Sequence, residues 1–219
     1  MGIMQIISRL FKLFILACLL YSSWLMLNLS LPYLQMKPNI DFLKTKELIY
    51  HIRHWRYSFY IHVFTGLFAL VAGMFQFNSY LIRNQKLVHR ITGYIYLLDV
   101  LFITGPSALV MAFYANGGIP ARTSFVILAT LWLFTTAMAW RQALKKKFIA
   151  HGSWMLRSYA LTLSAITLRT YAFLFGHFHI QMRPVHVYIT IAWLSWIPNL
   201  VVAEIMIRKG FIRSLFKTG

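Results

Sequence analysis

Several histidines of this chain lie near the ends of long apolar segments, where an imidazole can ligate a metal ion. The clearest case is His151, which opens a segment that is apolar enough to cross a bilayer yet also contains Arg157 and Arg169. On a helix, one face of this segment collects polar and small side chains: His151, Met155, Ser158, Thr162, Ala165 and Arg169. Such a stripe is costly in lipid unless it faces protein, water or a cofactor. The stripe is therefore the first candidate for a functional surface.

Pairs of histidines on different segments suggest haem ligation. Two imidazoles that face each other across a helical bundle are what a six-coordinate haem iron requires. His89 and His151 both begin apolar segments on the side predicted to be cytoplasmic, which predicts an inner pair of axial ligands. A weaker outer pair would join His62 to His186 or His177, because the fourth segment has no histidine. The predicted cofactor is haem b.

Glycines accompany two of these histidines. Gly66 follows His62 by four residues, and Gly93 follows His89 by four residues, so each glycine shares a helix face with its histidine. A glycine there removes the side chain that would obstruct a flat macrocycle. The same glycines permit close helix packing, which is the commoner reason for small residues in membrane helices. A cofactor-binding role for Gly66 and Gly93 and a packing role both stay open.

The charged residues inside apolar segments fall into two groups. Arg157 and Glu204 are expected to be structural, the first as an anchor and the second as the partner of a cytoplasmic arginine or lysine. Arg169 is placed to snorkel to the interface, or to meet a haem propionate or a quinone carbonyl. Asp99 is near the middle of the third segment, where a carboxylate should pair with an arginine or carry protons. Asp99 is therefore the candidate for a proton or charge path.

Composition and pattern predict an all-α polytopic membrane protein. Of the 219 residues, 59% are hydrophobic and only 12% are charged, whereas about a quarter of a soluble domain is charged. The net charge of +18 is explained by Lys and Arg in the connections, which set topology and do not indicate nucleic-acid binding. Six segments are long enough to span a bilayer: 10–31, 58–81, 91–114, 122–142, 153–176 and 185–207.

The charge of the connections predicts both topology and division of the chain. Lys and Arg gather before the first segment, after the second, after the fourth and after the sixth, which places both termini on the cytoplasmic side. The expected parts are an N-terminal anchor helix (1–31), an outer amphipathic segment (32–57), a five-helix membrane domain (58–207) and a basic cytoplasmic tail (208–219). The segment 32–57 is either an amphipathic helix on the membrane surface or a solvated loop. With one cysteine, Cys18, there is no internal disulfide.

The histidine-centred motifs resemble a known family. The motifs are Gly73-Met-Phe-Gln76, His89-Arg-Ile-Thr-Gly93-Tyr-Ile-Tyr96, Leu131-Trp132-Leu-Phe-Thr-Thr136 and His151-Gly-Ser-Trp154-Met155-Leu-Arg157-Ser158. Over roughly residues 55 to 205 they look like the predicted bacterial membrane proteins of domain-of-unknown-function family 2306. That family is similar in helical layout to the two-haem transmembrane cytochromes b. The resemblance implies a bacterial inner-membrane protein with a four-helix core, formed by the second to fifth segments, that holds haem between histidines. Those cytochromes usually have ligands on all four core helices, so this chain matches the inner pair better than the outer one.

Three functions remain open from the sequence. The first is a haem b protein that transfers electrons, with a quinol or another redox partner. The second is a non-catalytic assembly factor or a subunit of an envelope complex in the lipid bilayer. The third is a small-solute or proton transporter with Asp99 and Arg169 on the path, which the lack of inverted repeats disfavours.

Overall fold

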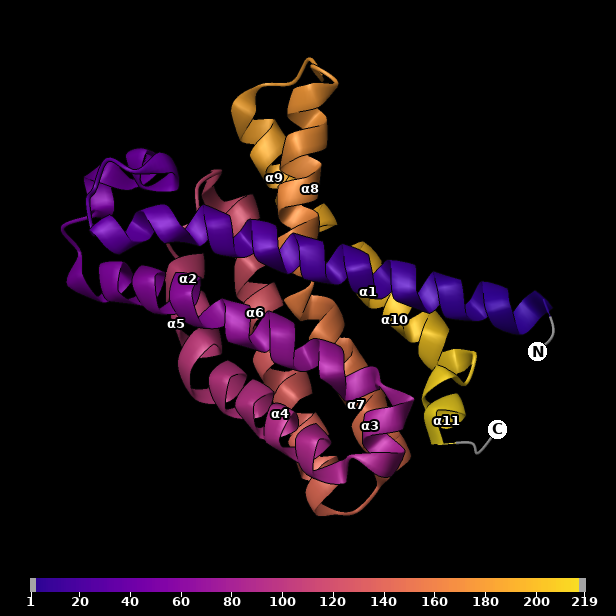
Figure 1. Cartoon of the computed structure of the whole chain (residues 1–219). Helices are drawn as coiled ribbons and strands as arrows, with labels where there is room; N and C mark the ends of the chain where they lie inside the picture. Colours follow the sequence, from indigo (N-terminus) through magenta and orange to yellow (C-terminus); the bar gives the residue numbers. More distant parts are fainter. Residues whose placement is uncertain (1–2, 217–219) are drawn as a thin grey trace.

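The computed structural model describes residues 3–216, and every regular element in that range is helical. The long first helix α1 is followed by short helical turns, a central group of packed helices, a helical hairpin and two further helices that lead to the C-terminus (Figure 1). In chain order the elements are α1 (Ile3–Ser30), η1 (Leu31–Gln35), η2 (Asp41–Ile49), α2 (Arg53–Met74), η3 (Phe75–Phe77), α3 (Ser79–Asn84), α4 (Lys86–Leu98), η4 (Asp99–Thr104), α5 (Gly105–Ala112), α6 (Gly118–Leu144), α7 (Phe148–Thr162), α8 (Ser164–His177), α9 (Pro184–Leu194), α10 (Ile197–Arg208) and α11 (Phe211–Phe216).

Five stretches of helix are long and apolar enough to cross a membrane: Leu13–Gln35, Arg53–Phe77, Lys86–Ala112, Gly118–Leu144 and Pro184–Arg208. The prediction of an all-helical membrane protein is confirmed, and five of the six predicted spans correspond to these stretches. The sixth, 153–176, is not among them. Its helix is broken at Leu163 between α7 and α8, and its two arginines and several hydroxyl side chains make it more polar than the other spans.

The core of the molecule lies between four helical units: α2, the continuous run from α4 through η4 to α5, α6, and α7 (Figure 1). These are the second to fifth predicted segments, which were expected to form the core. Each unit contributes buried apolar side chains to one cluster: Ala69, Ala72, Tyr96, Val100, Trp132, Ala139, Met155, Tyr159 and Leu161. The helices α9 and α10 pack against the outside of α6 and α7.

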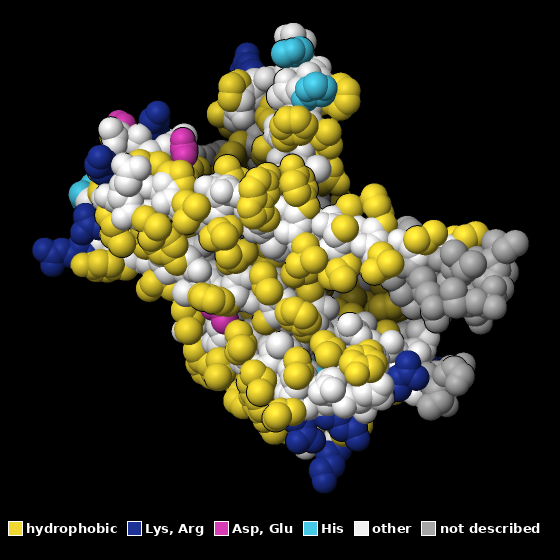
Figure 2. Space-filling model, in the orientation of Figure 1, with side chains coloured by type: hydrophobic (Ala, Val, Ile, Leu, Met, Phe, Trp, Pro, Cys, Tyr) yellow, Lys and Arg dark blue, Asp and Glu magenta, His cyan; other side chains and the backbone are white. Residues whose placement is uncertain are grey.

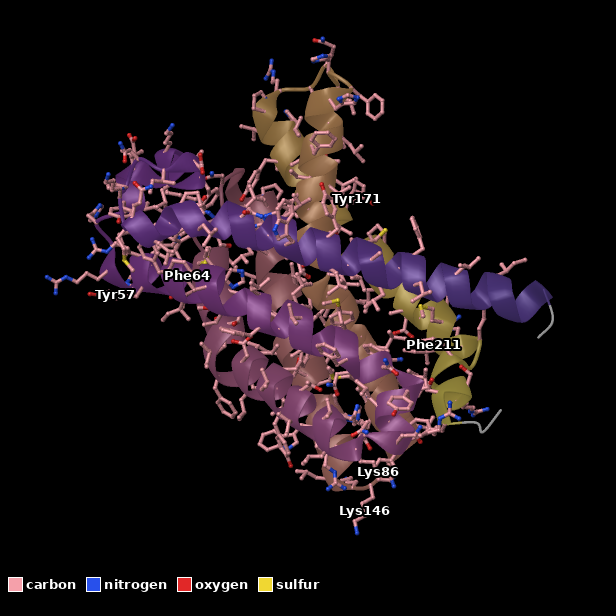
Figure 3. The ribbon with its side chains drawn as sticks, viewed as in Figure 1. Tyr57, Phe64, Lys86, Lys146, Tyr171 and Phe211 are labelled. Carbon is pink, nitrogen blue, oxygen red and sulfur yellow. The ribbon has the colours of Figure 1, made fainter. Side chains whose placement is uncertain are left out.

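Lys and Arg side chains lie at both ends of this bundle (Figure 2). Lys86 and Lys146 lie at one end, which we call the basic end, and Tyr57 at the start of α2 lies at the other (Figure 3). Hydrophobic side chains cover most of the visible surface between the ends, and Lys and Arg gather toward the ends (Figure 2). The side chains of Arg9 and Lys12, and all of Lys217, which were expected at the cytoplasmic side, lie outside the described residues.

Residues 31–52 form a cap on the end of the bundle opposite the basic end. The cap consists of η1 and η2, and its apolar side chains pack on the first turns of α2 around Tyr33, Leu43, Trp55, Phe59 and Tyr60. This segment is helical and packed, unlike a solvated loop, and its position at the membrane surface stays a prediction. The amphipathic pattern was read correctly, but its apolar face is buried by the protein's own α2 instead of by lipid.

Lys46 fastens the cap to the bundle. Its side chain is buried, and its Nζ donates hydrogen bonds to the carbonyl oxygen of Tyr114 at 2.5 Å and to Oδ1 of Asn116 at 2.6 Å. Neither acceptor is charged. Burial, together with the positive charge of Arg122, lowers the pKa of Lys46 to about 8.

Because the pKa of Lys46 is lowered, we expect the packing of the cap on the bundle to become more stable at alkaline pH. A lysine in an unfolded chain has a pKa near 10.4. Between about pH 8 and about pH 10 the undocked cap therefore binds more protons than the docked cap, so the stability of the docked cap rises with pH. Lys46→Met should remove this rise and destabilise the cap by about 1–3 kcal/mol, because two buried acceptors lose their donor. Thermal unfolding in detergent at about pH 7.5 and about pH 9.5 measures both effects. The neighbouring Lys44 is exposed, so Lys44→Met is the matched control, and an equal loss in both variants would contradict the assignment.

Candidate functional site

His89 and His151 both lie at the basic end. Each lies in the first turn of its helix, His89 in α4 and His151 in α7. The charge of His151 acts on His89 across the gap between the two helices. The inner pair of ligands stays a prediction, with one histidine in the first turn of each of two core helices.

The hydrogen bonds of these imidazoles leave ring nitrogens available. Nδ1 of His151 lies 2.8 Å from the carbonyl oxygen of Ala139. Because a carbonyl only accepts, Nδ1 must carry the proton, and in the neutral ring Nε2 presents a lone pair. Nδ1 of His89 is buried and has no hydrogen-bond partner among the described residues. Backbone-bonded Nδ1–H with a free Nε2 is the usual arrangement of a metal-ligating histidine.

Gln76 positions His89 from the neighbouring helix. Its carboxamide is buried and its Nε2 donates to Oγ1 of Thr92 at 2.8 Å, with the carbonyl oxygens of Ala72 and His89 at 3.4 and 3.5 Å. These bonds tie the end of α2 to the first turn of α4. The sequence analysis quoted Gln76 within a motif but assigned it no function. Its position one helical turn after Ala72 and Gly73 was the signal that could have placed its side chain on the packed face of the second segment.

The faces beside the histidines are filled by protein side chains. A methyl group added at Gly93 would lie 3.1 Å from Oε1 of Gln76, and one added at Gly66 would lie 3.6 Å from Cγ2 of Thr104. Of the two readings of these glycines, helix packing is the one that the structure supports. The side chains of Thr104 and Gln76 lie at these two faces, and a cofactor-binding role for Gly66 and Gly93 stays a prediction.

A buried hydroxyl network occupies the centre of the bundle. The Tyr96 hydroxyl lies 2.6 Å from Oγ of Ser158 and 2.7 Å from Oγ1 of Thr162, and Nε1 of Trp132 donates to Oγ1 of Thr162 at 3.0 Å. Thr136 extends the network, with its Oγ1 2.6 Å from Oγ of Ser158. The network joins α4, α6 and α7. It explains the inner part of the predicted stripe, because Ser158 and Thr162 face protein partners.

The outer part of the stripe behaves differently. The break at Leu163 separates Arg169 on α8 from the face of α7, and Arg169 is exposed, with Nη1 donating to the carbonyl oxygen of Ala165 at 2.8 Å. Its charge lies near His62 and Tyr33. Arg169 is separated from the end of the bundle that holds His89 and His151 by α7, which has 15 residues and is therefore about 22 Å long. The structure therefore does not support a role for Arg169 beside a propionate of a haem held by His89 and His151.

The outer histidine pair is not assembled. Nδ1 of His62 lies 3.4 Å from the carbonyl oxygen of Thr104, whereas His186 is exposed in the first turn of α9. His177 stacks on Phe173 near the end of α8. No contact between His62 and either partner is present among the described residues. The outer ligand pair therefore stays a prediction without a supporting contact, and α8 and α9 form a hairpin that extends away from α2 (Figure 1).

Arg157 and Glu204, both expected to be structural, form an ion pair with each other that the sequence analysis did not predict. Nε and Nη2 of Arg157 donate to the two carboxylate oxygens of Glu204 at 2.5 and 3.0 Å. The guanidinium also stacks over Trp154, 4.6 Å from the ring centroid. This pair joins α7 to α10, and neither residue is left to serve a ligand.

These features define a helical membrane protein with a histidine pair at one end and a buried carboxyl, Asp99, in its core. Residues 59–207 match the model of the family described as predicted membrane protein (DUF2306), and the chain belongs to this family. No curated protein and no solved structure matches the chain. The family resemblance predicted from the motifs is thereby confirmed, while the kinship to cytochromes b stays a prediction.

Proposed function

We propose that this protein binds one haem b at its basic end and transfers electrons there. The observation that carries the proposal is the pairing of His89 and His151 from two different core helices. One ring has Nε2 free because Nδ1 is held by a carbonyl, and the other has a buried nitrogen without a partner. A buried polar atom without a partner is unusual and calls for an explanation, and ligation of iron by these imidazoles is one.

The donor set fits an iron with two axial imidazoles. Among the described residues there is no group of three or more His, Cys, Asp or Glu side chains that would hold a bare metal ion. His89 and His151 would hold the group, the Ala139 carbonyl would fix the tautomer of His151, and Gln76 would fix the first turn of α4. When bound, haem b supplies a one-electron carrier. Since the outer pair is not assembled, the proposal is restricted to one haem.

The proposed setting is the bacterial inner membrane, with the basic end in the cytoplasm. The excess of Lys and Arg at that end supports this orientation through the positive-inside rule, and it places both termini inside if α7 and α8 together form a sixth span. A quinone is the proposed lipid-soluble redox partner. Arg169 and His62, which lie near each other on α8 and α2, are the residues suited to a quinone carbonyl.

The test is the absorption spectrum of the protein purified in detergent from cells supplied with a haem precursor. For the wild type we expect a Soret band and about one haem per chain. In His89→Ala and in His151→Ala the haem content per chain should fall about tenfold or more. His186→Ala is the matched control, because His186 is exposed and distant, and it should keep its haem. Size-exclusion chromatography confirms that each variant is folded. A wild-type protein without a Soret band would overturn the proposal.

The second candidate is a non-catalytic membrane subunit. It is favoured by the packing at Gly66 and Gly93, where side chains of the same protein fill the faces that a macrocycle would occupy. On this account, the double variant of His89 and His151 would leave both stability and partner binding unchanged.

A further inference from the structure

Asp99 lies in the core at a break in helical regularity. It opens η4, a six-residue π-helical turn between α4 and α5. Turns of this kind are rare and are frequently found at functional sites. Because a π-helix closes its hydrogen bonds between residues five apart, this turn brings Thr104 next to Asp99. Asp99 is 5% exposed and Thr104 is fully buried.

Three short contacts run from Asp99 to α2. Oδ1 of Asp99 lies 2.5 Å from Oγ1 of Thr104, which lies 2.5 Å from Oγ1 of Thr65. Oγ1 of Thr65 donates to the carbonyl oxygen of Ile61 at 2.8 Å. The other carboxyl oxygen, Oδ2, is buried and has no partner among the described residues.

Counting hydrogens decides the protonation state of Asp99. Each of the three oxygen–oxygen contacts needs one hydrogen, and the hydroxyls of Thr104 and Thr65 supply two. The carbonyl of Ile61 supplies none. If Asp99 is ionised, Thr104 donates to its Oδ1 and Thr65 donates to Ile61, which leaves the contact between Thr104 and Thr65 without a hydrogen. A hydrogen on Asp99 supplies all three contacts, because Asp99 then donates to Thr104, Thr104 to Thr65 and Thr65 to Ile61.

We propose that Asp99 is a proton-binding site, a neutral carboxylic acid at the head of a hydroxyl chain that leads to the partly exposed Thr65 on α2. An ionised carboxylate with one oxygen unpartnered in the core would be strongly disfavoured. The neutral acid satisfies every short contact. The ligand of the site is a proton, and the hydroxyl chain that holds it ends at the Ile61 carbonyl of α2. This site is independent of the histidine pair.

The titratable and charged groups that face Asp99 are few. Tyr96, one turn earlier on α4, has its hydroxyl held by Ser158 and Thr162. His62 on α2 reaches the Thr104 carbonyl at 3.4 Å, and the charge of Arg169 on α8 acts on His62. No lysine or arginine in the described part of the chain forms an ion pair with Asp99. The ion pair found among the described residues joins Arg157 to Glu204 instead.

Infrared spectroscopy of the purified protein tests this directly, because the chain has only 4 acidic side chains. A protonated carboxyl gives a carbonyl band separate from that of a carboxylate. We expect one such band at neutral pH in the wild type, its complete loss in Asp99→Asn, and its retention in Glu204→Gln, the matched control. Asparagine has the shape of the neutral acid and can donate to Thr104.

Should Asp99→Asn fail to fold, the variants Thr104→Val and Thr104→Ser replace it. Thr104→Val removes the partner hydroxyl and should shift the band, and Thr104→Ser keeps the hydroxyl and should leave the band in place. The absence of a protonated-carboxyl band from the wild type at neutral pH would overturn the proposal. Loss of the band when sodium ion is added at constant pH would also overturn it, because the site would then be a cation site.

Discussion

Gly73→Ala should severely impair folding, whereas Gly66→Ala, seven residues earlier on the same face of α2, should be tolerated. A methyl group at Gly73 would overlap the ring of Tyr159 and would lie 3.1 Å from Cε2 of Tyr96. The Tyr159 ring has little freedom to move away, because its hydroxyl donates to the carbonyl oxygen of Leu70 at 3.2 Å. Overpacking in a filled core typically costs about 1–3 kcal/mol, and more when neighbours are fixed.

The comparison between these two glycines makes the prediction specific. The methyl group of Gly66→Ala would meet Cγ2 of Thr104 at 3.6 Å, which is ordinary van der Waals contact. Thermal unfolding in detergent should show a fall of the midpoint for Gly73→Ala and almost none for Gly66→Ala. Equal behaviour of the two variants would mean that α2 and α7 do not pack as described.

Tyr96→Phe should destabilise the bundle by about 2 kcal/mol. The Tyr96 hydroxyl contacts Ser158 and Thr162 and accepts from Nε1 of Trp132 at 3.3 Å. Loss of the hydroxyl leaves these buried groups with fewer partners, and each one left unsatisfied costs about 1–3 kcal/mol. A partly satisfied polar network in a low-dielectric core is worse than an apolar one.

Tyr94→Phe is the matched control for this prediction. Tyr94 lies two residues before Tyr96 on α4, and its side chain is 59% exposed, so its hydroxyl is not part of the network. Chemical or thermal unfolding should separate the two variants clearly. If Tyr96→Phe were as stable as Tyr94→Phe, the network would not hold α4, α6 and α7 together.

Much of the architecture could be predicted because helical periodicity and bilayer length are local properties. The stripe from His151 to Thr162 was correctly placed on one face, and Ser158 and Thr162 proved to face protein. The placement of His89 and His151 at the same end followed from topology, since both begin core helices there.

Other features depend on contacts that no local pattern reveals. The stripe could not be followed to Arg169, because the helix breaks at Leu163 without a proline or glycine to signal the break. Small residues at Gly66 and Gly93 fit a macrocycle and a neighbouring helix equally well, and only the positions of Thr104 and Gln76 distinguish the two. The packing of the cap on α2 was missed because an amphipathic pattern predicts an apolar partner but does not tell protein from lipid.

The π-helical turn at Asp99 was also beyond sequence analysis. Asp99 and Thr104 are five residues apart, and on a regular α-helix that spacing does not put two side chains next to each other. The turn brings them together and creates the hydroxyl chain. The sequence could therefore select Asp99 as a candidate for carrying protons, but not identify its partners.

The most direct test of the central claim is electron paramagnetic resonance of the oxidised, purified protein. Two imidazoles from His89 and His151 on one iron predict a single low-spin ferric haem signal. His151→Ala should convert it to a high-spin signal, and added imidazole should restore the low-spin form. A haem signal that is unchanged in both His89→Ala and His151→Ala, or no haem signal in the wild type, would contradict the account.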